Sequence, residues 1–178
     1  MSGRVYWGAR LVDKAGTPLP ADAELGVRAR ARFVSRGGHK LDGALDRLGL
    51  EVGALTCVDV GASTGGFTDC LLQRAAARVY AVDVGRGQLD AALRADPRVV
   101  VMDRTNARHL PADALDPAPD LVVVDASFIS IELLLGAIAG WLAPGGRLLA
   151  LVKPQFEAGR AEASRGRGIW RRGGDRVD

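Results

Sequence analysis

Apolar and polar residues follow one another along this chain in a pattern that predicts a parallel sheet covered by helices. Short apolar runs rich in valine predict buried strands at residues 56–60, 78–83, 98–102, 120–125 and 147–152. Longer stretches with helical spacing predict helices near residues 66–76, 87–94 and 130–142. Nearly continuous apolar strands that alternate with helices are typical of an α/β fold, whose ligands bind at the carboxyl ends of the strands.

The two ends of the chain differ from this central pattern. Residues 1–34 contain only two brief predicted strands, Val5–Trp7 and Arg10–Val12, which is too little for an independent domain. Ser35 then suits the N-cap of a helix that Gly49 would end. We therefore expect a first segment over 1–34, one domain over 35–157, and an Arg/Gly-rich disordered tail over 158–178 whose Trp170 and arginines could contact RNA.

The charge is distributed unevenly along the 178 residues. The first 40 residues carry eight Lys or Arg against three acidic residues, and the last 21 carry six Arg against three, although the net charge is only +3. The part between the two ends is therefore acidic. Basic ends on an acidic body are compatible with binding of a polyanion, but also with solvated ends that only keep the protein in solution.

Composition excludes several classes of protein. No run of about 18 uncharged apolar residues is present, so we expect no membrane span. Cys57 and Cys70 fall in a predicted strand and helix, as buried thiols do in the reducing cytoplasm. The only histidines, His39 and His109, are isolated, and we expect no metal site.

A glycine-rich turn, residues 61–66, follows the first strand of the predicted sheet. Asp59 lies inside that strand, Phe67 opens the following helix, and Asp83 ends the next strand. Glycines at such a turn let a ligand approach the backbone, and an acid closing the next strand suits ribose hydroxyls. The spacing departs from G-x-G-x-x-G, and Asp59 would repel a pyrophosphate but accept the ammonium of a methionine moiety. The residues favour S-adenosylmethionine over NAD, with an ordinary glycine-rich turn as the alternative.

Three further ionisable residues are predicted at the same edge of the sheet. Asp125 ends a buried strand, Lys153 follows the neighbouring strand, and Lys40 lies on the early helix. Two lysines beside an aspartate suit deprotonation of a weakly acidic hydroxyl, followed by its attack on a methyl group. A structural ion-pair network at the strand ends is the alternative.

Two more pairs of residues are weaker candidates. Asp103 and Asn106 follow the third strand, where they could hold an adenine, but an Asx turn explains them nearly as well. Phe128 and Phe156 could stack on a substrate base, with core packing favoured for at least one of them.

Taken together, these residues resemble the TlyA family of FtsJ-like RNA 2′-O-ribose methyltransferases, which is sometimes labelled hemolysin A. The resemblance runs from about residue 4 to residue 160, and the matching motifs are residues 33–41, 59–69, 82–85, 124–130 and 151–157. It implies a Rossmann-like S-adenosylmethionine-dependent fold, ribosomal RNA or ribosomal subunits as partners, and a lysine–aspartate–lysine–glutamate tetrad whose first three members match Lys40, Asp125 and Lys153. The expected cofactor site comprises Asp59, Gly61, Ala62, Ser63, Gly65, Gly66, Phe67, Asp83, Val84, Asp103 and Asn106.

The chain departs from the family at both ends. Residues 4–27 resemble only the strand-rich half of an S4-like RNA-binding domain, and Glu157 and Glu162 follow Lys153 too closely to be the fourth member of the tetrad. We therefore expect a truncated cytoplasmic ribosomal RNA 2′-O-ribose methyltransferase of undetermined oligomeric state. The alternative is a non-catalytic remnant that binds RNA or the cofactor. A membrane-active cytolysin, which the label hemolysin suggests, has no supporting segment.

Overall fold

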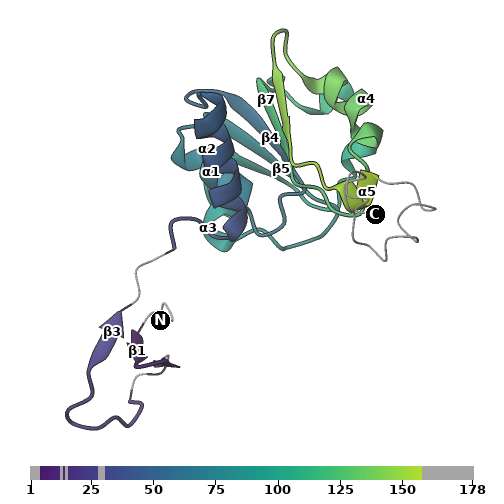
Figure 1. Cartoon of the computed structure of the whole chain (residues 1–178). Coiled ribbons are helices and arrows are strands. Elements are labelled where there is room, and N and C mark those ends of the chain that lie inside the picture. The colour runs from purple at the N-terminus through teal and green to yellow at the C-terminus, as the bar shows by residue number, and fades with distance from the viewer. Residues whose placement is uncertain (1–4, 13, 15, 28–30, 158–178) are drawn as a thin grey trace, which may run out of the picture. The chain divides into compact units, whose positions relative to one another are not determined.

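A computed structural model describes residues 5–12, 14, 16–27 and 31–157 (Figure 1). The chain divides into two compact units, Met1–Arg32 and Phe33–Asp178. The predicted tail over 158–178 lies outside the described residues. In the described part of the chain, no helix combines the length and apolarity that a membrane span requires.

The first unit is a small antiparallel sheet. Strand β1 (Val5–Trp7) pairs with β2 (Arg10–Leu11) on one side and with β3 (Leu25–Val27) on the other. The first two strands were predicted. The third was not, because a three-residue strand with a glycine at its centre has no alternating pattern to recognise.

The second unit is built on a five-stranded sheet in which every neighbouring pair is parallel. Its strand order is β6-β5-β4-β7-β8, so the chain builds outwards from β4 in one direction and then crosses over to build in the other. This order confirms the predicted α/β class. The strands are β4 (Thr56–Val60), β5 (Arg78–Val82), β6 (Val99–Met102), β7 (Leu121–Val124) and β8 (Arg147–Ala150).

Helices cover both faces of this sheet, as Figure 1 shows. One apolar cluster packs α1 and α2 on one face, and a second cluster packs α4 on the other. Alternate residues of a strand supply the two clusters, Cys57 to the first and Val58 to the second. The helices are α1 (Arg36–Leu48), α2 (Gly66–Gln73), α3 (Ala91–Arg94), α4 (Glu132–Trp141) and α5 (Pro154–Glu157), with short 3-10 helices η1 (Ala107–His109) and η2 (Ala112–Ala114).

Helix α1 has the two ends that the sequence predicts. The hydroxyl of Ser35 accepts a hydrogen bond from Gly37 N, and Gly49 ends the helix in a left-handed conformation with φ of 59°. Helix α3 is shorter than the predicted helix over 87–94. Asp90 caps it through Ala92 N, so the residues before Asp90 belong to the preceding loop.

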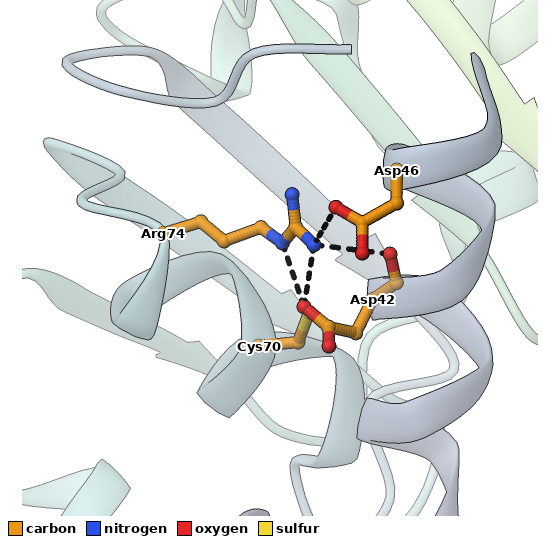
Figure 2. A network of polar contacts seen from close by, with 4 residues as sticks. All are labelled: Asp42, Asp46, Cys70 and Arg74. Atoms are coloured by element: carbon orange, nitrogen blue, oxygen red, sulfur yellow. Dashed lines mark hydrogen bonds and ion pairs between the residues drawn. The ribbon is translucent and has the colours of Figure 1, made fainter. Parts of the chain in front are cut away.

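An arginine holds α1 against the end of α2 (Figure 2). Arg74 Nη2 lies 2.6 Å from the Oδ1 atoms of both Asp42 and Asp46, and Nε lies 2.8 Å from Asp42 Oδ1. The carboxylate of Asp42 is largely buried, and the ion pair with Arg74 offsets the free-energy cost of burying its charge. The contact fixes the helix that carries Lys40.

Candidate active site

Two adjoining pockets open at the carboxyl ends of the parallel strands. The larger pocket has a volume of about 530 Å³ and the smaller one about 310 Å³. Gly61, Ser63, Asp125 and Ser127 line both. The pockets lie beside the point where the strand order reverses between β4 and β7, which is where α/β sheets bind ligands.

The larger pocket brings together the three residues of the predicted lysine–aspartate–lysine set. Lys40 reaches it from α1, Asp125 from the end of β7, and Lys153 from the segment after β8. Lys153 Nζ forms an ion pair at 2.7 Å with Asp125 Oδ1, without the alignment of a hydrogen bond. It also donates to Ala126 O at 3.1 Å and Ser127 Oγ at 2.9 Å. These acceptors fix the position of the Lys153 side chain.

Lys40 lines the same pocket without such restraints. Among the described residues, no hydrogen bond or ion pair holds its side chain. The two lysines therefore differ, since polar contacts hold the side chain of Lys153 and none from the described residues holds that of Lys40.

Asp59 is the most deeply buried ionisable group of the larger pocket, with 1% of its surface exposed. Its Oδ2 accepts hydrogen bonds from Thr68 N at 2.9 Å and Thr68 Oγ1 at 2.7 Å. Its Oδ1 has no hydrogen-bond partner among the described residues. Burial raises the pKa of Asp59 to about 7, and the nearby charges of Asp125 and Asp83 add to this rise, against the opposing hydrogen bonds of Thr68.

A buried carboxylate oxygen without a hydrogen-bond partner is unfavourable, and a positively charged ligand that donates a hydrogen bond would stabilise it. The ammonium of a methionine moiety would satisfy Asp59 Oδ1, which is the role that the sequence predicts. Thr68 was not foreseen, although a hydroxyl in the first turn of the helix after a glycine-rich turn is a signal that could have identified it.

The smaller pocket combines an acid at its rim with an apolar interior. Asp83 Oδ2 accepts from Ser63 N at 2.8 Å, and Oδ1 accepts from Gly85 N at 2.7 Å. These bonds fix the carboxylate and leave further lone pairs for ribose hydroxyls. Gln88, which the sequence analysis did not single out, joins the rim by accepting from Ser63 Oγ at 3.2 Å. The remaining lining includes Val60, Val82, Val84, Asn106, Ala107, Ile129 and Leu134.

Asp103 is not brought to either pocket. Its Oδ2 accepts from Gly87 N at 3.1 Å and from Arg94 Nη2 at 2.9 Å. The hydrogen bond from Gly87, followed by that from Arg94, keeps the pKa of Asp103 below its ordinary value. Asn106 does line the smaller pocket, and its Oδ1 accepts from Arg108 N as the cap of η1. Of the predicted adenine pair, the structure therefore brings only Asn106 to the pocket.

The glycines of the turn lie where the backbone meets other parts of the fold closely. Gly61 has φ of 84°, and a Cβ there would lie 3.1 Å from Asp125 O. Gly65 lines neither pocket, and a Cβ there would overlap Leu93. Gly66 lines the larger pocket with Ala62 and Phe67, but a Cβ there would overlap Ser35 at the start of α1. Packing against α1 thus requires a glycine at position 66, and the φ of 96° favours one at position 65, whereas the sequence analysis attributed both to ligand access, with an ordinary glycine-rich turn as the alternative.

Phe128 stands at the edge of the smaller pocket with 90% of its surface exposed. Its ring centroid lies 5.2 Å from that of Phe156, which is half-buried. Of the two aromatic residues, Phe128 is the one presented to solvent.

Comparison with known proteins identifies the family. The family model for FtsJ-like methyltransferase matches residues 33–171. The chain belongs to the FtsJ-like methyltransferase family. The match extends eleven residues beyond residue 160, where the sequence analysis ended its resemblance. Members of the FtsJ-like family use S-adenosylmethionine, which agrees with the predicted cofactor.

Relatives within this family carry the predicted TlyA and hemolysin names. TlyA of Mycobacterium tuberculosis, named a 16S/23S rRNA (cytidine-2′-O)-methyltransferase, is 52% identical over 134 residues, which are 75% of this chain and 50% of that protein. Hemolysin A of Brachyspira hyodysenteriae is 41% identical over 160 residues, which are 89% of this chain and 66% of that protein. This chain therefore spans one half to two thirds of the length of these relatives.

A solved structure extends the comparison to three dimensions. A protein of Lactococcus lactis labelled as a hemolysin is 49% identical, with a TM-score of 0.71 over 74% of this chain and 64% of that chain. The predicted resemblance to TlyA proteins is confirmed by these relatives.

Proposed function

We propose that this chain is the catalytic body of an S-adenosylmethionine-dependent methyltransferase that modifies ribose 2′-hydroxyls of ribosomal RNA in the cytoplasm. The observation that carries the proposal is the meeting of Lys40, Asp125 and Lys153 in one pocket with the unpartnered oxygen of Asp59. The names of the relatives support the choice of RNA as substrate.

The cofactor site would extend across both pockets. Asp59 would bind the ammonium of the methionine moiety, Asp83 the ribose hydroxyls, and the apolar lining of the smaller pocket the adenine. The bound cofactor supplies an electrophilic methyl group. Because Asp125 and Ser127 line both pockets, they lie where the cofactor would meet the substrate.

Each residue of the lysine–aspartate–lysine set then has a separate task. Lys40, whose side chain has no hydrogen bond or ion pair with the residues that the structure describes, would remove the proton of the 2′-hydroxyl as it attacks. Lys153, fixed in position by its ion pair with Asp125 and its hydrogen bond to Ala126 O, would stabilise the negative charge that develops on the hydroxyl oxygen. Asp125 would orient both the ammonium and the hydroxyl.

Two features suit a nucleic-acid substrate. Arg36, in the first turn of α1, lines the larger pocket beside Lys40, where it could bind a phosphate next to the target ribose. The exposed ring of Phe128 offers a surface on which a base of unpaired RNA could stack.

The experiment that tests the proposal separates binding from transfer. Calorimetry with S-adenosylmethionine on the native chain and on Asp83→Ala measures the cofactor site. Transfer of a labelled methyl group to unmodified ribosomal subunits measures catalysis. Lys40→Ala is expected to lower transfer by about 10²–10⁴-fold with little change in cofactor affinity, whereas the surface change Arg47→Ala, also on α1, leaves both unchanged.

The outcomes distinguish the two functions considered. Cofactor binding without transfer to any ribosomal RNA would favour a non-catalytic binding protein. A folded chain that binds no S-adenosylmethionine would refute the proposal altogether.

A further inference from the structure

The loop of residues 125–131, which joins β7 to α4, forms a wall of both pockets. Asp125 and Ser127 face both, and residues 126, 128 and 129 line the smaller one. The loop is held in an unusual conformation, because Phe128 has φ of 66°, a region that bulky residues seldom adopt. We call residues 125–131 the wall loop, and contacts with another segment are needed to hold it in this conformation.

The segment that follows β8, residues 151–157, contacts the wall loop at three points. Lys153 Nζ binds the loop near Asp125, as described above. The ring of Phe156 packs against that of Phe128. Glu157 binds the far end of the loop, with Oε2 accepting from Ser130 Oγ at 2.6 Å and Oε1 accepting from Ile131 N at 3.0 Å.

The Glu157 contact is more than a cap for α4. Ser130 Oγ already accepts a hydrogen bond from Glu132 N at 3.2 Å, so the helix start has a local partner. Glu157 instead joins two segments that are 26 residues or more apart in the chain, and both of its carboxylate oxygens take part. Hydrogen bonds to a carboxylate are shorter and stronger than those between neutral groups.

We propose that Glu157 is a positioning residue, which holds the wall loop against the cofactor pocket by clasping Ser130 and Ile131. The proposal rests on the proposed function, because the pocket in question is the proposed cofactor site. The sequence analysis excluded Glu157 from the catalytic tetrad. In the structure both oxygens of its carboxylate accept hydrogen bonds from the wall loop. It acts through Asp125 and the apolar wall, which it keeps in position.

The test measures the loop directly and the cofactor separately. Glu157→Gln keeps the shape of the side chain and removes its charge. Hydrogen–deuterium exchange of the native chain and the variant, both without cofactor, reports on the amides of residues 126–131, of which Ile131 N is itself bound to Glu157. We expect exchange there to accelerate about tenfold, and the dissociation constant for S-adenosylmethionine to rise by a similar factor. Glu132→Gln removes a carboxylate from the same turn of α4 without touching the clasp, and should change neither.

Each result bears on one proposal or the other. Exchange and affinity within twofold of the native chain in Glu157→Gln, or equal losses in Glu132→Gln, would overturn the role of Glu157. If the variant also exposes the amides of β4, Glu157→Asp becomes the deciding variant, because it keeps the charge but shortens the arm. It should then show the same local loss in residues 126–131 with β4 protected, and uniform loss would overturn the proposal. Failure of the native chain to bind the cofactor would refute the proposed function, while the exchange data would still decide whether the clasp exists.

Discussion

Asp59→Asn tests the electrostatics of the site through stability as well as through binding. The native carboxylate is buried at the end of β4, with Oδ2 bound to Thr68 and Oδ1 without a partner among the described residues. Asparagine has nearly the same shape and can accept both hydrogen bonds from Thr68. It cannot ionise, and it brings an amide nitrogen in place of one oxygen.

The magnitude follows from the pKa of Asp59, which burial raises from 3.8 to about 7. Below pH 3.8 the carboxyl is protonated in the folded and unfolded states alike. Between the two pKa values the unfolded chain binds fewer protons than the folded one, so the free energy of unfolding falls as the pH rises. The full shift corresponds to roughly 4 kcal/mol, of which more than half develops between pH 5 and pH 8. The unpaired amide of the variant costs about 1–3 kcal/mol at every pH.

The assay is urea unfolding of the native chain and the variant at pH 5 and pH 8. We expect the stability of Asp59→Asn, measured relative to the native chain, to improve by about 2–3 kcal/mol between the two pH values. Its affinity for S-adenosylmethionine should fall by about 100-fold, since an amide cannot balance an ammonium charge. Asp113→Asn, the same carboxylate-to-amide change in η2 outside both pockets, provides the control and should leave the affinity for S-adenosylmethionine unchanged. A difference between the native chain and Asp59→Asn that is the same at both pH values would refute the reasoning.

Three further predictions test the packing around the site. Gly66→Ala should cost about 1–3 kcal/mol of stability by urea unfolding and lower methyl transfer, because its Cβ would overlap Ser35 and push α1 outwards; full activity would contradict this. Arg74→Met should cost about 3 kcal/mol, because it removes the cation that is paired with the largely buried carboxylate of Asp42, and a loss below 1 kcal/mol would show that the pair contributes little. Asp103→Asn should leave cofactor affinity within about twofold, since Asp103 lines neither pocket, and a tenfold loss by calorimetry would place it in the site after all.

The sheet could be predicted from the sequence because its strands are buried on both faces. Runs such as residues 121–124 are apolar at every position, and the glycines and acids around them mark their ends. The helices were predicted less well where a loop competes for the same residues. The predicted helix over 87–94 begins only after Asp90, because Gly87 and Gln88 contact Asp103 and Ser63 instead.

The site could be predicted as far as topology determines it. The carboxyl ends of parallel strands meet at one edge of the sheet, so Asp59, Asp125 and Lys153 had to lie near one another. Which side chain turns into the pocket depends on contacts between distant segments. Asp103 follows an edge strand and pairs with Arg94, and nothing in the local sequence distinguishes it from an acid that faces a ligand. For Glu157 the sequence indicated no role near the pockets, because its partners lie on a loop that precedes it by 26 residues or more.

The glycines of the two helix starts link the proposed base to the proposed cofactor site. A Cβ on Gly66 would meet Ser35 and the backbone of Gly37 and Gly38, so α1 can lie against α2 only because side chains are absent there. Lys40 lies one turn further along α1, and the turn that precedes Gly66 lines the same pocket. A small displacement of α1 would therefore move Lys40 relative to any ligand bound by that turn. Atoms in a transfer reaction must be placed within fractions of an ångström. The glycine-rich turn of residues 61–66 would therefore have a second task beside ligand binding, which is to set the distance between Lys40 and the methyl group of the cofactor.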